Sequence, residues 1–436
     1  MNIANLSFST LPPISVPFRY FISAAVFLML CAGFILFSGE ATWLSRWHPN
    51  MLVITHLFTL GFISMVMMGA IFQFLPVIGG VGVPNARAVA SIAHSLHTLG
   101  TLALSVSFIF PNSVVRIIAI LALGVGFTFY IFAIANVLIK KLSQGYTIIG
   151  MRLALFSLIL VVGLGLLFLA QNMLLPYVDI RFLSNKNYTD IHALIGGFGW
   201  AGLLILAVSL QIIPMFHVTP AFPKWVGRYL PSSLVALLLS LFIFNPDSVV
   251  GKIMTISILA LYIAFALIVL NLFKQRKRKV VDTSVQFWQL AAASFLAVVC
   301  LYFLPDAFFV DFFNGNKSLL LGAIFLFFYL VSIIEAMLLK IIPFLTYTHL
   351  QNLCLSDFSA MAHLPHMHEL LLKKHGRWLF YLHLLSGCTL IITLALTQFY
   401  GLFAFALFAE FSLLLYLMLR SLRMYKQCLN KISQNV

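Results

Sequence analysis

The chain has 436 residues, of which 62% are hydrophobic and 8% are charged. Soluble domains carry about 25% charged residues, so this composition excludes a soluble enzyme, a secreted disulfide scaffold and a disordered protein. The formal net charge of +15 would suggest nucleic-acid binding in a soluble protein. Here the basic residues follow the loops between apolar segments, and no nucleic-acid partner is expected.

Apolar segments of about 20 residues recur along the whole chain, which is the length that an α-helix needs to cross a bilayer. The sequence therefore predicts an all-α, polytopic membrane protein whose main partner is the lipid bilayer. Twelve spans are expected, at residues 18–38, 50–78, 88–110, 113–139, 150–174, 189–215, 225–244, 248–273, 285–305, 318–345, 376–397 and 400–420.

Charge then predicts the orientation of these spans. If the N-terminus lies in the cytoplasm, most of the 26 lysines and arginines fall in inner loops, including the run from Lys274 to Lys279. Inner loops of membrane proteins carry an excess of basic residues. Both termini are therefore expected in the cytoplasm, with the protein in a bacterial-type inner (cytoplasmic) membrane. The basic residues left on the outer side are Arg46, Arg116, Arg181, Lys186, Lys252 and Lys317.

A short pattern recurs near the inner ends of the second, sixth and tenth predicted spans. It ends at Pro76, Pro214 and Pro343, which are 138 and then 129 residues apart. This spacing predicts three pseudo-symmetric four-helix repeats, at about 1–145, 146–280 and 281–436, within a single transmembrane domain of residues 1–436. The alternative is that each proline ends its helix and a polar side chain three residues earlier caps the freed carbonyl groups. Those polar residues are Gln73, Gln211 and Lys340.

Five histidines fall inside the predicted spans, and His383 occupies the position in its repeat that His97 occupies in the first. Ionisable residues inside a bilayer are costly and are by default functional. Because neutral imidazole is a strong ligand for haem iron and copper, all five are candidate cofactor ligands. His94 and His97 share one helix face and are candidate ligands of a single metal. The alternative for each is an interhelical hydrogen bond. The five are His56, His94, His97, His192 and His383.

Two loops add candidate ligands. Arg46, between the first two spans, has the charge to hold haem propionates. Residues 346–375 form an expected cytoplasmic, histidine-rich loop with His363, His366 and His368. Imidazole interleaved with methionine suits copper, so these three are candidate metal ligands. The alternative is an amphipathic segment that lies on the membrane surface.

Apart from Asp190 at the outer end of span 189–215, the acidic residues inside the predicted spans are Glu335 and Glu410. Glu335 is expected to pair with Lys340 near the inner surface, which leaves Glu410 embedded in the membrane. A membrane-embedded carboxylate together with histidines is typical of proton and cation routes. This pattern supports an alternative function, the proton-coupled transport of a metal or a small solute.

Twelve spans, threefold repeats and a histidine on the second helix of a repeat resemble the large subunit of haem–copper oxidases and nitric-oxide reductases, and also the NnrS family. The resemblance implies that His56 ligates a low-spin haem and that His192 ligates copper. Span 318–345, from which the oxidases take ligands of both haems, has no histidine here, so the ligand set of an oxygen-reducing oxidoreductase is incomplete. The resemblance implies a haem-binding protein, with copper as a second candidate cofactor, that acts in electron transfer or in gas, nitrosative-stress or metal handling. Its expected partners are respiratory-chain or other membrane subunits.

Overall fold

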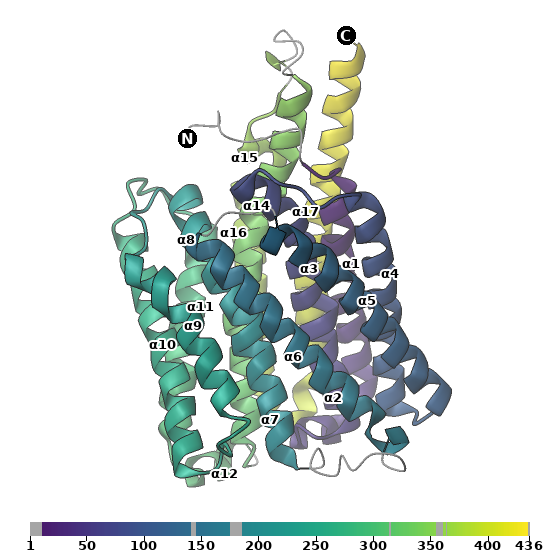
Figure 1. The fold of residues 1–436 in the computed structure, drawn as a ribbon, viewed down its shortest axis with the longest axis vertical. Helices are drawn as coiled ribbons and strands as arrows, with labels where there is room; N and C mark the ends of the chain where they lie inside the picture. Colours follow the sequence, from purple (N-terminus) through teal and green to yellow (C-terminus); the bar gives the residue numbers. More distant parts are fainter. Residues whose placement is uncertain are drawn as a thin grey trace. The chain divides into compact units, whose positions relative to one another are not determined.

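The structure is a computed structural model that describes residues 11–140, 145–174, 185–313, 315–354, 361–362 and 364–434. These residues form helices and no strands (Figure 1). Within the same residues, eleven helices are long and apolar enough to cross a membrane. The prediction of an all-α polytopic membrane protein is therefore confirmed.

The described residues divide into two compact units. The first unit contains residues 83–280, and the second contains residues 11–82 together with those after 280. The helices of the first unit are α4 (Ala86–Ile109), α5 (Ser113–Lys140), α6 (Tyr146–Leu174), α7 (Lys186–Leu194), η6 (Ile195–Gly202), α8 (Leu203–His217), α9 (Lys224–Ser240) and α10 (Val249–Lys274).

The second unit joins the two ends of the chain. In Figure 1 the purple α1 runs beside the yellow α17, and the two helices are in contact. Its helices from the N-terminal part are α1 (Ser15–Ser38), η3 (Glu40–Leu44), α2 (Pro49–His56), η4 (Leu57–Ser64) and α3 (Met65–Gly79). Those from the C-terminal part are α11 (Thr283–Phe303), α12 (Ala307–Phe313), α13 (Lys317–Ala323), η7 (Ile324–Val331), α14 (Ser332–Leu353), α15 (Met367–Leu370), α16 (Lys373–Ala395), η9 (Thr397–Phe399) and α17 (Tyr400–Gln434).

Each predicted span corresponds to a helix or to a run of helices, and the largest differences are at the ends. The predicted span 225–244 corresponds to α9, which stops at Ser240 after 17 residues. By contrast, α14 continues beyond 345 to Leu353, so the first part of the predicted loop 346–375 is helical. The extension is stabilised by packing, because Leu350 and Cys354 form a buried cluster with Ile432 of α17.

Three π-helical segments interrupt three long helical runs, Pro49–Gly79, Lys186–His217 and Lys317–Leu353. They are η4, η6 and η7, each of eight residues, and they begin 138 and then 129 residues apart. The three prolines have the same two separations. A π-segment hydrogen-bonds from i to i+5, which offsets the side chains on either side of it and is frequent at functional sites.

The three prolines do not end their helices. Pro76, Pro214 and Pro343 lie inside α3, α8 and α14, which continue to Gly79, His217 and Leu353. Two of the expected polar caps are not formed. The buried amide of Gln73 has no hydrogen-bond partner among the described residues, and Lys340 Nζ instead donates to Asp282 Oδ2 at 2.6 Å.

Candidate cation site

Three helices of the second unit bring three ionisable side chains together. Glu335 lies on α14, His383 at the middle of α16 and Glu410 on α17. All three side chains have 0% exposure. One nitrogen and two carboxylate oxygens lie within 4.8 Å of one another, and this is the only such group of three His, Cys, Asp or Glu side chains among the described residues. We call these three residues the triad.

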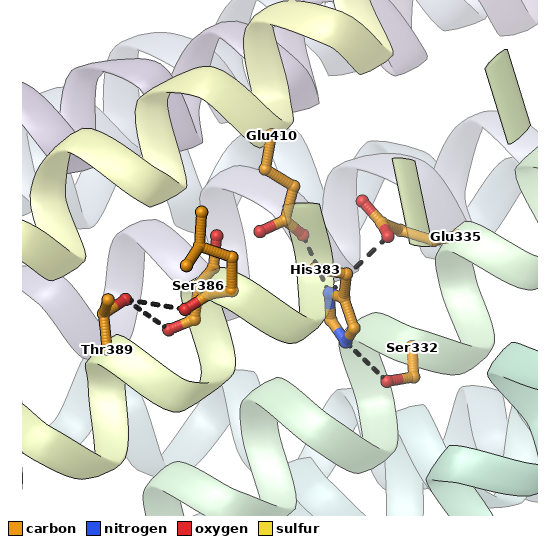
Figure 2. Close-up of polar contacts among 7 residues, drawn as sticks. Ser332, Glu335, His383, Ser386, Thr389 and Glu410 are labelled. Carbon is orange, nitrogen blue, oxygen red and sulfur yellow. Dashed lines mark hydrogen bonds and ion pairs between the residues drawn. The ribbon is translucent and has the colours of Figure 1, made fainter. Parts of the chain in front are cut away.

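Both ring nitrogens of His383 are engaged. Nδ1 lies 2.8 Å from Glu410 Oε1 and 3.6 Å from Glu335 Oε2. Nε2 is hydrogen-bonded at 2.7 Å to the hydroxyl of Ser332, one turn before Glu335 on α14. Figure 2 shows the two glutamates converging on one side of the ring and Ser332 on the other. The imidazole is therefore fixed in orientation.

Aromatic side chains cover the ring of His383. Phe327, from the π-segment η7, stacks on it with ring centroids 4.5 Å apart and planes 11° apart. The ring of Phe287 on α11 also packs against the imidazole, with ring centroids 5.3 Å apart. Close approach of α16 to η7 depends on Gly387, since a Cβ there would collide with the ring of Phe328. These contacts keep water away from the triad and give it a low-dielectric environment, in which charge interactions are strong.

The carboxylates are incompletely satisfied. Among the described residues, the oxygens of Glu335 and Oε2 of Glu410 have no hydrogen-bond partner outside the triad, in which the two carboxyl groups interact with each other. An ionised carboxylate in such a place costs several kcal/mol unless a proton or a cation neutralises it. Two of them side by side therefore need positive charge between them.

The expected pairing of Glu335 with Lys340 is wrong. Lys340 forms its ion pair with Asp282, at 2.6 Å. Glu335 is consequently buried in the triad, not neutralised near a membrane surface. Lys340 is the nearest basic residue to Glu335 in the sequence, five residues further along α14. In the fold, however, Asp282 at the start of α11 lies beside Lys340 and pairs with it.

The other intramembrane histidines lie in separate environments. His97 is buried, and its ring meets the edge of Phe127 at 5.0 Å. His94, on the same helix, is half-buried. The half-buried ring of His192 packs on Phe168 at 5.7 Å. His56 Nδ1 donates to the carbonyl oxygen of Leu52, 2.7 Å away on its own helix.

The loop candidates lie at the surface. The rings of His366 and His368 are exposed and stack on each other at 5.3 Å. His363, like Arg181, lies outside the described residues. The Arg46 guanidinium lies over the ring of its neighbour Trp47, 4.6 Å from the centroid.

The haem hypothesis fits these residues unequally. His383 does not fit a haem, because the rings of Phe327 and Phe287 pack on its imidazole, where the flat macrocycle would have to lie. His56 fits better, since a histidine whose Nδ1 donates to a carbonyl presents Nε2 in a fixed direction, as metal-bound histidines do.

No protein-family model matches this sequence, and comparison with curated proteins gives no match either.

Proposed function

We propose that this chain is a proton-coupled cation transporter of the inner membrane, and that Glu335, His383 and Glu410 hold the transported cation or the proton that is coupled to it. One observation carries the proposal: three ionisable side chains from three helices are in contact with 0% exposure. Such groups are costly inside a bilayer and mark ion pathways and proton relays. A purely structural role would be served at lower cost by apolar packing.

The proposal is tested by cation-driven proton flux. The purified protein is reconstituted in liposomes that contain a pH-sensitive dye, and Na⁺, K⁺, Mn²⁺ or Zn²⁺ is added outside in turn. At least one of these cations should change the internal pH in the wild type and not in Glu335→Gln or Glu410→Gln. Glu369→Gln makes the same change at an exposed acid and should behave like the wild type. Absence of flux with every cation would refute the proposal.

The transporter is proposed to have twelve spans in three four-helix repeats. The recurrence of π-segments and prolines at the same separations supports the repeats. The span that completes the twelve is α9, in addition to the eleven long apolar helices. Its 17 residues rise about 26 Å, close to the hydrocarbon thickness of about 30 Å. Contacts within the second unit fit the predicted alternation of the spans. His349 donates to the carbonyl oxygen of Pro12, so both lie at one end, and Asn316 donates to that of Leu44, so both lie at one end as well.

Haem binding is a second candidate, favoured by the hydrogen bond from His56 to Leu52. Optical spectra of the oxidised and dithionite-reduced protein, made in haem-replete cells, test it directly. A Soret band that His56→Ala or His192→Ala removes would support the haem hypothesis. A colourless protein would refute it and leave the transporter in place.

A further inference from the structure

We infer that the cation held by the triad is a divalent first-row transition-metal ion, bound by His383 Nδ1 and by one oxygen each of Glu335 and Glu410. The inference rests on the proposed function, because it names the substrate of the same site. It is argued in turn from the donor atoms, their spacing, their surroundings and their charge.

The donor set favours a transition metal. Mg²⁺ and Ca²⁺ select oxygen ligands alone, whereas imidazole suits Zn²⁺, Co²⁺, Fe²⁺ and Ni²⁺, which also accept carboxylate oxygen. The three atoms of the triad are one nitrogen and two oxygens, with no sulfur among them. A site without thiolate or thioether does not select Cu⁺.

The spacing of the donor atoms fits one ion. Ligands about 2.1 Å from a tetrahedral ion lie about 3.4 Å from one another. From His383 Nδ1, the two carboxylate oxygens are 3.6 Å and 2.8 Å away. The shorter distance is that of a hydrogen bond, and opening it by well under 1 Å would admit the ion. All three side chains already point to the same place (Figure 2).

The surroundings of the triad resemble the support of a metal site. Histidine ligands almost always donate their second ring N–H to another group, which fixes the tautomer. Ser332 Oγ takes that position, 2.7 Å from Nε2. When Nε2 donates to Ser332 Oγ, Nδ1 carries no proton, and its lone pair is available to an ion held beside the carboxylates. The oxygens of Glu335, which have no hydrogen-bond partner outside the triad among the described residues, keep lone pairs available for the ion.

Charge selects a divalent ion. Two ionised carboxylates and a neutral imidazole carry a net charge of −2, and burial at 0% exposure disfavours any net charge that remains. A divalent ion brings the site to zero, whereas one Na⁺ or K⁺ leaves a negative charge in the low-dielectric interior. Electrostatics therefore discriminates against monovalent metals.

The test uses Co²⁺, whose visible absorption reports ligand type and geometry. Purified protein in detergent is titrated with Co²⁺ and, separately, with Zn²⁺ followed by elemental analysis. The titration is repeated in His363→Ala/His366→Ala/His368→Ala, which removes the competing loop histidines. We expect one ion per chain in both proteins. Loss of stoichiometric binding in the triple variant would overturn the inference without any change to the triad.

Single substitutions then locate the ion. Glu335→Gln and Glu410→Gln should each weaken Co²⁺ binding at least about tenfold, since even second-shell changes cost 10–100-fold. Glu369→Gln should bind like the wild type. Unchanged binding in both triad variants would place the ion elsewhere and overturn the inference. Gel filtration of each variant controls for folding.

The two proposals fail in different ways. If Na⁺ or K⁺ drives triad-dependent proton flux and Co²⁺ does not bind, the metal inference is wrong and the cation transporter stands. If Co²⁺ binds at the triad and no cation drives flux, the chain has a metal site without transport. Binding of Zn²⁺ at the triad together with triad-dependent proton flux driven by Zn²⁺ supports both proposals.

Discussion

At the scale of single residues, Ser332 is the polar partner of the His383 nitrogen that faces away from the carboxylates. Its hydroxyl is hydrogen-bonded to Nε2 at 2.7 Å. Ser332→Ala removes this partner and should weaken Co²⁺ binding about tenfold, because second-shell partners of metal-bound histidines contribute factors of 10–100. Isothermal titration of the detergent-purified variant measures the change.

Ser332→Thr is the matched control for this prediction. It keeps the hydroxyl, so it should bind Co²⁺ within a few-fold of the wild type, with an unaltered visible spectrum. Equal loss in both variants would instead indicate a packing effect, because Ser332 has 0% exposure.

Metal binding at the triad should also depend on pH. Carboxylate and imidazole ligands must lose their protons before they coordinate an ion. With a neutral imidazole and two ionised carboxylates, the triad has a net charge of −2. Without metal, about two added protons would neutralise it, as burial favours. Affinity for Co²⁺ should therefore fall as the pH is lowered, and proton release of about two per ion should appear in unbuffered titrations. An affinity that does not change with pH would argue against triad ligation.

The sequence predicted part of this site. His383 stands out because a histidine in an apolar span is rare, and Glu410 stands out for the same reason. Glu335 was assigned to the wrong partner, although the repeat pattern contains a signal. Glu335 lies eight residues before Pro343, and the equivalent positions in the first and second copies of the pattern are Met68 and Leu206. An acidic residue at a position that is apolar in the other two copies indicates a role specific to the third repeat. Ser332 could not be found, since a serine that bonds across helices has no distinguishing pattern.

At the scale of elements, the π-segment η7 and the helix α16 must approach closely to form the triad. A methyl group at Gly387 would collide with the ring of Phe328. Gly387→Ala should therefore destabilise the protein by about 1–3 kcal/mol, the usual cost of overpacking, and weaken Co²⁺ binding as well. Thermal unfolding in detergent measures the first effect.

Gly33→Ala makes the same change on α1, where a Cβ would meet nothing within 4 Å. It should be neutral or slightly stabilising, because alanine has the higher helix propensity. If both variants unfold at the wild-type temperature, α16 and η7 do not pack as tightly as described.

Helix positions followed from hydropathy, but interruptions and ends did not. Proline was read as a possible helix end, whereas α3, α8 and α14 continue past it. Neighbouring helices in a bundle supply the packing that offsets the lost hydrogen bond. The π-segments have no signature in composition. The repeated pattern that ends at the three prolines indicates where the π-segments lie, but it does not predict that they are π-helical.

At the scale of the whole molecule, the side of the membrane on which the C-terminus lies depends on whether α9 crosses the bilayer. Two basic clusters flank the pair α9 and α10, namely Lys224 with Arg228 and the run Lys274 to Lys279. The backbone N–H of Lys277 donates to the carbonyl oxygen of Val218 at 3.0 Å, so the residues before α9 and those after α10 meet at one end of the first unit. The pair is therefore a hairpin, and the positive-inside rule predicts that both clusters lie in the cytoplasm.

With this hairpin we expect α9 to cross the membrane in spite of its 17 residues, and this expectation fixes a topology that can be tested. Alkaline phosphatase inserted at Asp247, between α9 and α10, should be active outside the cytoplasm. A fluorescent protein fused at the C-terminus should fold and fluoresce inside, as should one fused at the N-terminus. If α9 only lay in the interface, every later span would be inverted. The phosphatase at Asp247 would then be inactive, and the C-terminal fusion would be dark.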